Sequence, residues 1–210
     1  MAATSRSDLS PVERPTAFVL GIDPGRHGAA VLLDRRARVV ALIAWRPSTR
    51  RGIRGYRIGL VEEGNRWTPD PAGLAEEVVR LSRRVGGHRA AVYVEDSFVG
   101  RNPRTAMLIA RWSGCLVGGL LGTSRGWVEG IEWVGADQWR SVALGLGTAI
   151  KRAEAKRLTR EAVGERFSSI GSLSSSTVSE HVADAIGVAL YGIEHQHQQA
   201  RGSRDAESSE

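Results

Sequence analysis

Three acidic residues stand at positions where their side chains can act together. Asp23 ends the first strand-like apolar run of the chain, and Glu95 ends the fourth. If these two strands are parallel neighbours, both carboxylates emerge at the carboxyl edge of the sheet, where α/β proteins bind ligands. Asp184 lies near the start of the last predicted helix, and His181 stands three residues before it on the same helical face. We therefore expect these four side chains to form one site.

A carboxylate cluster of this kind favours a hard divalent cation. Neighbouring carboxylates repel one another unless a cation neutralises them. The oxygen-rich set suits Mg²⁺ or Mn²⁺ better than zinc, because Cys115 is the only cysteine of the chain. Two such ions, about 3.5–4 Å apart, can activate a water molecule and stabilise the leaving oxygen in phosphodiester cleavage. The cluster therefore indicates metal-dependent hydrolysis of a phosphodiester.

Each of these residues also has an ordinary structural explanation. An aspartate after a strand commonly caps a turn or a helix, and His181 alone is typical of a helix-face histidine. Asp96 is left out of the site, because its side chain should point to the opposite side of the strand end from Glu95. The joint placement of the acidic residues, in a basic chain, is what favours a functional site.

The elements expected to position these residues form an α/β sandwich. Residues 17–22, 28–33 and 38–45 predict an antiparallel meander of three strands, and residues 90–94 and 131–134 predict two further strands. Helices are predicted from residue 71 onward and over residues 103–121, 137–144, 151–167 and 179–193. This order predicts one five-stranded mixed sheet, with the meander antiparallel and the last two strands parallel, flanked by helices on both faces.

The chain is expected to hold one folded domain. Residues 1–14 predict a flexible leader, residues 15–195 the folded body, and residues 196–210 a disordered tail. Residues 46–67 do not fit the sandwich plan, since they carry six arginines with a tyrosine and a tryptophan among them. Two interpretations of this stretch are equally good: a solvated surface hairpin, or an arm that binds nucleic acid.

Composition narrows the class of protein. With 210 residues, 41% hydrophobic and 25% charged, the chain can bury a globular core. No uninterrupted apolar run approaches the roughly 20 residues that cross a bilayer, so no membrane partner is expected, and the single cysteine fits a reducing cytoplasm. The net charge of +6 and the pI of about 10.3 favour a polyanionic partner. A coding bias explains why 27 of the 29 basic residues are arginine, so the two lysines, Lys151 and Lys156, stand out.

Four motifs, in order over residues 17–193, resemble the RuvC-type Holliday-junction resolvases. The motifs are Gly21-Ile22-Asp23-Pro24-Gly25 with Gly28-Ala29-Ala30-Val31, then Val94-Glu95-Asp96-Ser97-Phe98-Val99-Gly100-Arg101-Asn102, then Gly145-Leu146-Gly147-Thr148-Ala149-Ile150-Lys151, and last Glu180-His181-Val182-Ala183-Asp184-Ala185. The resemblance implies an RNase H-like fold. It also implies a metal-dependent endonuclease that resolves four-way DNA junctions by paired nicks, with two Mg²⁺ ions per site and Mn²⁺ as the alternative ion.

The resemblance assigns roles to individual residues. The implied metal ligands are Asp23, Glu95, His181 and Asp184. Lys151 is expected near the scissile phosphate, where a fixed cation offsets developing negative charge, and Phe98 is expected to stack on unpaired bases, unless it is a core aromatic under its loop. The residues expected to contact DNA are Phe98, Arg101, Arg140, Lys151 and Lys156.

A homodimer is also implied, with one site for each of two opposed strands. The predicted helix at residues 103–121 is the expected interface, because Gly114, Gly118 and Gly119 allow close approach of a second helix. An ordinary buried helix is the alternative. The expected place of action is the cytoplasm, at the nucleoid or in a host cell if the chain is phage-encoded, and a branch-migration motor is left unspecified.

Three other functions are compatible with parts of the sequence. The motif at residues 21–25 also resembles the first phosphate loop of actin-like ATPases and sugar kinases, but those proteins need two such domains, for which the chain is too short. A nuclease for forks, flaps or other branched DNA keeps the same site, and the long stretch at residues 46–67 departs from the compact pattern of the resolvases. A junction-binding protein without activity is disfavoured, because idle carboxylates beside phosphates would weaken binding.

Overall fold

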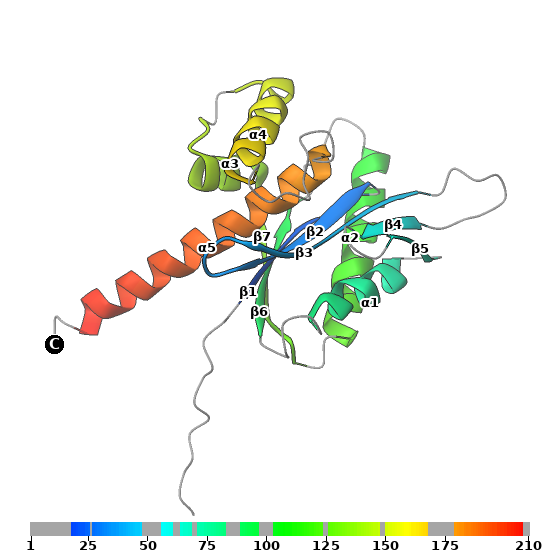
Figure 1. The fold of residues 1–210 in the computed structure, drawn as a ribbon, viewed down its shortest axis with the longest axis horizontal. Helices are drawn as coiled ribbons and strands as arrows, with labels where there is room; N and C mark the ends of the chain where they lie inside the picture. The colour runs from blue at the N-terminus through cyan, green and yellow to red at the C-terminus, as the bar shows by residue number, and fades with distance from the viewer. Residues whose placement is uncertain are drawn as a thin grey trace, which may run out of the picture.

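The computed structural model describes residues 18–25, 27–47, 56–60, 64–68, 71–82, 89–96, 103–123, 126–147, 150–167 and 179–207. Within them, one mixed sheet lies between two layers of helices (Figure 1). The strands are β1 (Phe18–Asp23), β2 (Gly28–Asp34), β3 (Val39–Pro47), β4 (Tyr56–Leu60), β5 (Gly64–Thr68), β6 (Ala90–Glu95) and β7 (Val128–Val134). The α/β class predicted from the sequence is confirmed.

The order of strands in the sheet is β5-β4-β3-β2-β1-β6-β7. β1 to β5 pair antiparallel with their sequence neighbours, whereas β6 pairs parallel with β1, and β7 pairs parallel with β6. Ile22 of β1 is in register with Val94 of β6. Asp23 and Glu95, the next residue of each strand, therefore leave the sheet at the same edge, as the sequence predicted.

The sheet has seven strands in the described part of the chain, where the sequence predicted five. The two additional strands, β4 and β5, come from the arginine-rich stretch and form a hairpin on the outer side of β3. β3 continues to Pro47, so its last residues offer backbone groups to β4, with Trp45 opposite Ile58. The structure therefore shows that this stretch contains a hairpin, and its role toward nucleic acid stays a prediction.

Five helices cover the two faces of this sheet. They are α1 (Pro71–Ser82), α2 (Pro103–Thr123), α3 (Ala136–Leu144), α4 (Arg152–Phe167) and α5 (Glu180–Glu207). One face packs against α1 and α2, through a core that includes Leu74 and Leu116. The other face packs against α5, with α3 and α4 next to it, through a core that includes Trp139 and Ile186.

Close approach between α5 and β1 brings the last predicted motif to the edge of the sheet. A Cβ atom at Gly21 would collide with the backbone carbonyl oxygen of Ala185 and lie 2.5 Å from the backbone nitrogen of Ala189. Glycine at this position therefore lets the α5 backbone rest directly on β1. The contact sets Asp184, one residue before Ala185, beside the end of β1.

α5 is longer than the sequence predicted. The helix continues to Glu207 and takes in most of the segment expected to be a disordered tail. Figure 1 shows its C-terminal half, in orange and red, running on past the sheet. Residues 194–201 hold three glutamines with one glutamate, one alanine and one arginine, residue types that favour helix without needing a core. The leader at residues 1–14 lies outside the described residues.

Candidate metal site

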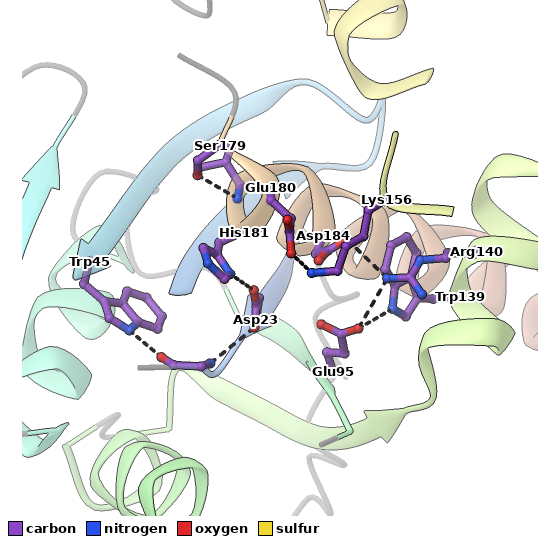
Figure 2. A network of polar contacts seen from close by, with 12 residues as sticks. Asp23, Trp45, Glu95, Trp139, Arg140, Lys156, Ser179, Glu180, His181 and Asp184 are labelled. Atoms are coloured by element: carbon purple, nitrogen blue, oxygen red, sulfur yellow. Dashed lines mark hydrogen bonds and ion pairs between the residues drawn. The ribbon is translucent and has the colours of Figure 1, made fainter. Parts of the chain in front are cut away.

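Three carboxylates converge at the carboxyl edge of the sheet. Asp23 comes from the end of β1, Glu95 from the end of β6, and Asp184 from the first turns of α5. One carboxylate oxygen from each lies within 4.8 Å of the other two (Figure 2). Asp23 and Asp184 are only 8% and 5% exposed. Among the described residues, Asp96 is not part of this group, in agreement with the sequence analysis.

Burial and mutual repulsion make this group electrostatically costly. The pKa of Glu95 is raised to about 8, first by burial and then by the negative charges of Asp23 and Asp184. Burial also raises the pKa of Asp184, and the charge of Asp23 adds to the effect. A divalent cation lowers this cost, since it supplies further positive charge to three carboxylates held close together. The donor set is all oxygen, and it fits Mg²⁺ or Mn²⁺.

His181 borders the carboxylates and binds one of them. Its Nδ1 lies 2.6 Å from Oδ2 of Asp23, and this hydrogen bond raises the pKa of the imidazole. With the proton on Nδ1, the ring donates to Asp23 and leaves Nε2 free to accept. The ring also stacks on His27, with centroids 5.9 Å apart. His181 therefore orients Asp23, and its expected role as a metal ligand stays a prediction.

The turn that follows Asp23 is fixed from β3. The backbone N–H of Gly25 donates to Oδ1 of Asp23 at 3.2 Å, and the indole N–H of Trp45 donates to the carbonyl of Gly25 at 3.0 Å. Trp45 is buried and stacks on Trp112 of α2. Sequence analysis did not identify Trp45 as a supporting residue. The sequence offers one indication of such a role: a tryptophan in an apolar strand is expected to be buried, and its indole N–H then needs a hydrogen-bond acceptor.

Arg140 of α3 lies inside the acidic cluster. Sequence analysis expected it to contact a phosphate, but it is 8% exposed, and its Nη2 lies 3.4 Å from Oδ1 of Asp184 and 3.9 Å from Oε1 of Glu95. The neighbouring Trp139 was not identified from the sequence. Its indole N–H donates to Oε1 of Glu95 at 3.4 Å, and its ring lies 4.6 Å from the Arg140 guanidinium carbon.

The two lysines differ in their relation to the site. Lys156 of α4 forms an ion pair with Glu180 at the start of α5, and its ammonium group is close enough to interact with the charges of Asp184, Asp23 and Glu95. Burial lowers the pKa of Lys156. Lys151, which the resemblance places near the scissile phosphate, is exposed at the start of α4.

Two further residues expected to contact DNA cannot be placed. Phe98 and Arg101 lie in the segment between β6 and α2, which is outside the described residues. Their expected roles in base stacking and phosphate contact therefore stay predictions.

The fold is similar to that of solved RuvC structures. No protein-family model matches the sequence, and no curated protein matches it either. A structure of Thermus thermophilus RuvC in complex with a Holliday-junction substrate is 19% identical, with 87% of this chain and 96% of that chain covered and a TM-score of 0.52. A second Thermus thermophilus RuvC structure gives the same identity and coverage, with a TM-score of 0.50. This likeness confirms the predicted RuvC-like, RNase H-like fold.

Proposed function

We propose that this protein is a metal-dependent endonuclease that resolves four-way DNA junctions by paired nicks. The observation that carries the proposal is the convergence of Asp23, Glu95 and Asp184 within 4.8 Å on a RuvC-like fold. The net charge of +6 adds support, since a basic protein is attracted to the phosphates of DNA. The proposed place of action is the cytoplasm, where such DNA is accessible.

Asp23, Glu95 and Asp184 would hold Mg²⁺ or Mn²⁺, and His181 is proposed to join them through its free Nε2. Two ions, when bound, supply an activated water and stabilise the leaving oxygen. The protein's own residues prepare the site: His181 and the Gly25 N–H fix the two oxygens of Asp23, and Trp139 fixes one oxygen of Glu95. Such hydrogen bonds orient metal ligands before the metal arrives.

Cations at the rim of the site are proposed to bind the phosphates on either side of the cut. Lys156 lies near the carboxylates, and Lys151 is exposed five residues earlier, immediately before α4. An ammonium group on a flexible stem can approach a single phosphate oxygen as a point charge. Phe98 and Arg101 are proposed to contact the unpaired bases and the backbone at the junction centre.

A homodimer is proposed to form through the exposed face of α2. Met107, Leu108 and Leu121 are 72%, 64% and 56% exposed on this helix, an unusual number of large apolar side chains left uncovered on one helix. Cβ atoms at Gly114 and Gly118 would meet nothing within 4 Å, so this face is open to a second helix. A C₂ pair of chains would offer one site to each of two strands.

The apolar character of α2 has a second possible explanation, which is a membrane-spanning helix. By length and composition α2 could cross a membrane, and only 22% of its most apolar window is buried. Its other side is nevertheless part of the core, where Trp112, Leu116 and Leu120 are buried against the sheet and α1. A helix that shares a core with a sheet is part of the folded domain, so its exposed apolar side favours a protein partner, which we propose to be a second copy of the chain.

Cleavage of synthetic DNA tests the proposal. We expect a four-way junction to be nicked symmetrically in Mg²⁺, and a Y-fork, a flap and a linear duplex to be cut much more slowly. Chelation of the metal should stop the reaction. Equal cutting of all four substrates would indicate a general nuclease, and faster cutting of forks or flaps would indicate the alternative of another branched-DNA nuclease. Binding without cutting, in Mg²⁺ and in Mn²⁺, would indicate a junction-binding protein.

Substitution of single carboxylates tests which of them DNA cleavage requires. Asp23→Asn, Glu95→Gln and Asp184→Asn keep the shape of each side chain but remove a charge that the metal requires. Each variant should lose cleavage and bind junctions as tightly as the unchanged protein or more tightly, because repulsion of the DNA phosphates also falls. A variant that cuts near the unchanged rate would remove that residue from the site.

A further inference from the structure

The acidic cluster already contains a cation that belongs to the protein. We propose that Arg140 is a resident counter-ion, which stabilises the metal-free cluster and competes with the divalent ion for Glu95 and Asp184. The inference rests on the proposed metal site and adds a property to it: the charge of Arg140 lowers the affinity of the site for a divalent ion.

The position of the guanidinium carries the inference. Nη2 of Arg140 lies between two of the three carboxylates, 3.4 Å from Asp184 and 3.9 Å from Glu95. Figure 2 shows the arginine reaching the cluster from α3, on the opposite side from His181. It therefore faces the same carboxylate oxygens that a metal ion would need.

The hydrogen bonds of Arg140 are incomplete, which distinguishes it from an arginine buried for structural reasons. Buried guanidinium groups are normally satisfied through most of their five N–H donors. Here Nε is buried without a hydrogen-bond partner in the described part of the chain, and the contact to Asp184 is long for a charge-assisted bond. The Trp139 ring supports the group from one side, 4.6 Å from the guanidinium carbon. Charge, more than hydrogen bonding, holds it in place.

Competition with a metal follows from this arrangement. A divalent ion on Glu95 and Asp184 would stand next to the fixed positive charge of Arg140, and like charges this close repel strongly. A guanidinium cannot relieve the repulsion by losing its proton. Metal binding is therefore weaker than three carboxylates alone would give, and the metal-free protein is more stable than it would be without the arginine.

The affinity for Mn²⁺ tests the inference by calorimetry, without DNA and without cleavage. Arg140→Gln removes the charge and keeps a donor for Asp184, so we expect Mn²⁺ to bind about tenfold more tightly or better. Arg140→Lys keeps the charge and should bind Mn²⁺ as the unchanged protein does. Arg160→Gln, at an exposed arginine of α4, is the matched control and should change nothing. An unchanged or weaker affinity in Arg140→Gln would overturn the inference.

Thermal unfolding with a chelator gives an independent measurement. Arg140→Gln should unfold at a lower temperature than the unchanged protein, and saturating Mn²⁺ should restore most of the loss. A loss that Mn²⁺ does not restore would show a purely structural role and would contradict the inference. If neither protein binds Mn²⁺, both the proposed metal site and this inference fail. If both bind it equally, only the role of Arg140 fails, and the proposed nuclease stands.

Discussion

At the scale of single residues, the site is organised around Asp23. Its Oδ1 accepts from the Gly25 backbone and its Oδ2 from His181, so neither oxygen can rotate freely. Within the described part of the chain, Glu95 accepts a hydrogen bond from one donor, the indole of Trp139. The unequal support would leave Glu95 as the more adaptable metal ligand, and burial together with the charges of Asp23 and Asp184 raises its pKa to about 8.

This electrostatic cost predicts how the metal-free protein responds to pH. The pKa of Glu95 is about 8 in the folded chain, above its ordinary value of 4.5, so the folded state binds the proton more tightly than the unfolded state does. Stability from this group is full below pH 4.5 and is lost as the pH rises through 8. The raised pKa values of Asp184 and His181 act in the same direction. With a chelator present, the unfolding temperature should therefore fall between about pH 4.5 and pH 8.

Glu95→Gln provides the control for this pH dependence. The variant has no carboxyl group to titrate at this position, so its unfolding temperature should change less over the same range. Saturating Mg²⁺ should reverse the trend in the unchanged protein, because ionised carboxylates bind the metal best. A chelated protein that becomes more stable as the pH rises to 8 would contradict the assignment of a Glu95 whose charge Arg140 offsets only in part.

The two lysines allow a second prediction at this scale. Lys156 lies among the charges of the cluster, whereas Lys151 is exposed. Loss of a preorganised cation at a developing charge costs about 10²–10³ in rate. We expect Lys156→Met to reduce single-turnover cleavage by a factor of this order with junction binding little changed. If Lys151→Met shows that loss and Lys156→Met does not, the cation at the scissile phosphate is Lys151, as the resemblance to the resolvases implies.

At the scale of elements, the strand ends could be predicted, and the position of Arg140 beside the carboxylates could not. Asp23 and Glu95 close apolar runs, and parallel pairing then carries both to one edge of the sheet. Arg140 gave no such signal, because the inward direction of its side chain depends on how α3 packs against α5. The β4–β5 hairpin was one of two interpretations of residues 46–67, and its strands could not be bounded because arginines interrupt the alternation that marks a strand. Hydrophobic periodicity indicates which residues are buried in a core. The Arg140 side chain and the β4–β5 hairpin lie at the edge of the core, so periodicity does not predict them.

The approach of α5 to β1 makes Gly21 a sensitive position. Gly21→Ala would place a methyl group against the backbone of Ala185 and Ala189, where no flexible side chain can give way. The helix must shift outward, which costs roughly 1–3 kcal/mol of stability and moves Asp184 away from Asp23. Chemical denaturation should show the loss, and calorimetry should show weaker Mn²⁺ binding. Gly164→Ala, on α4 with open space around it, is the control and should be neutral or stabilising.

At the scale of the whole molecule, the fold presents its chemistry on one face and its exposed apolar helix on the other. The acidic cluster lies on the α5 side of the sheet, and α2 covers the opposite side. A stack of two tryptophans, Trp45 and Trp112, connects α2 with the turn after Asp23. A second chain bound to α2 would therefore leave both acidic clusters uncovered for DNA.

Gly118 tests whether α2 is where two copies meet. A side chain at this position enters open space in the single chain, so Gly118→Arg should not disturb the fold and should even favour the helix. In a dimer whose helices approach at this glycine, two arginines would meet across the axis and repel. We expect the unchanged protein to scatter light as a dimer at tens of micromolar and Gly118→Arg as a monomer of equal thermal stability. The monomer should still nick a junction but lose the pairing of the two nicks, because each strand then needs a separate binding event.

Gly164→Arg adds the same charge on α4 and should remain dimeric. An unchanged protein that is monomeric under these conditions, or a Gly118→Arg variant that stays dimeric, would place the interface elsewhere.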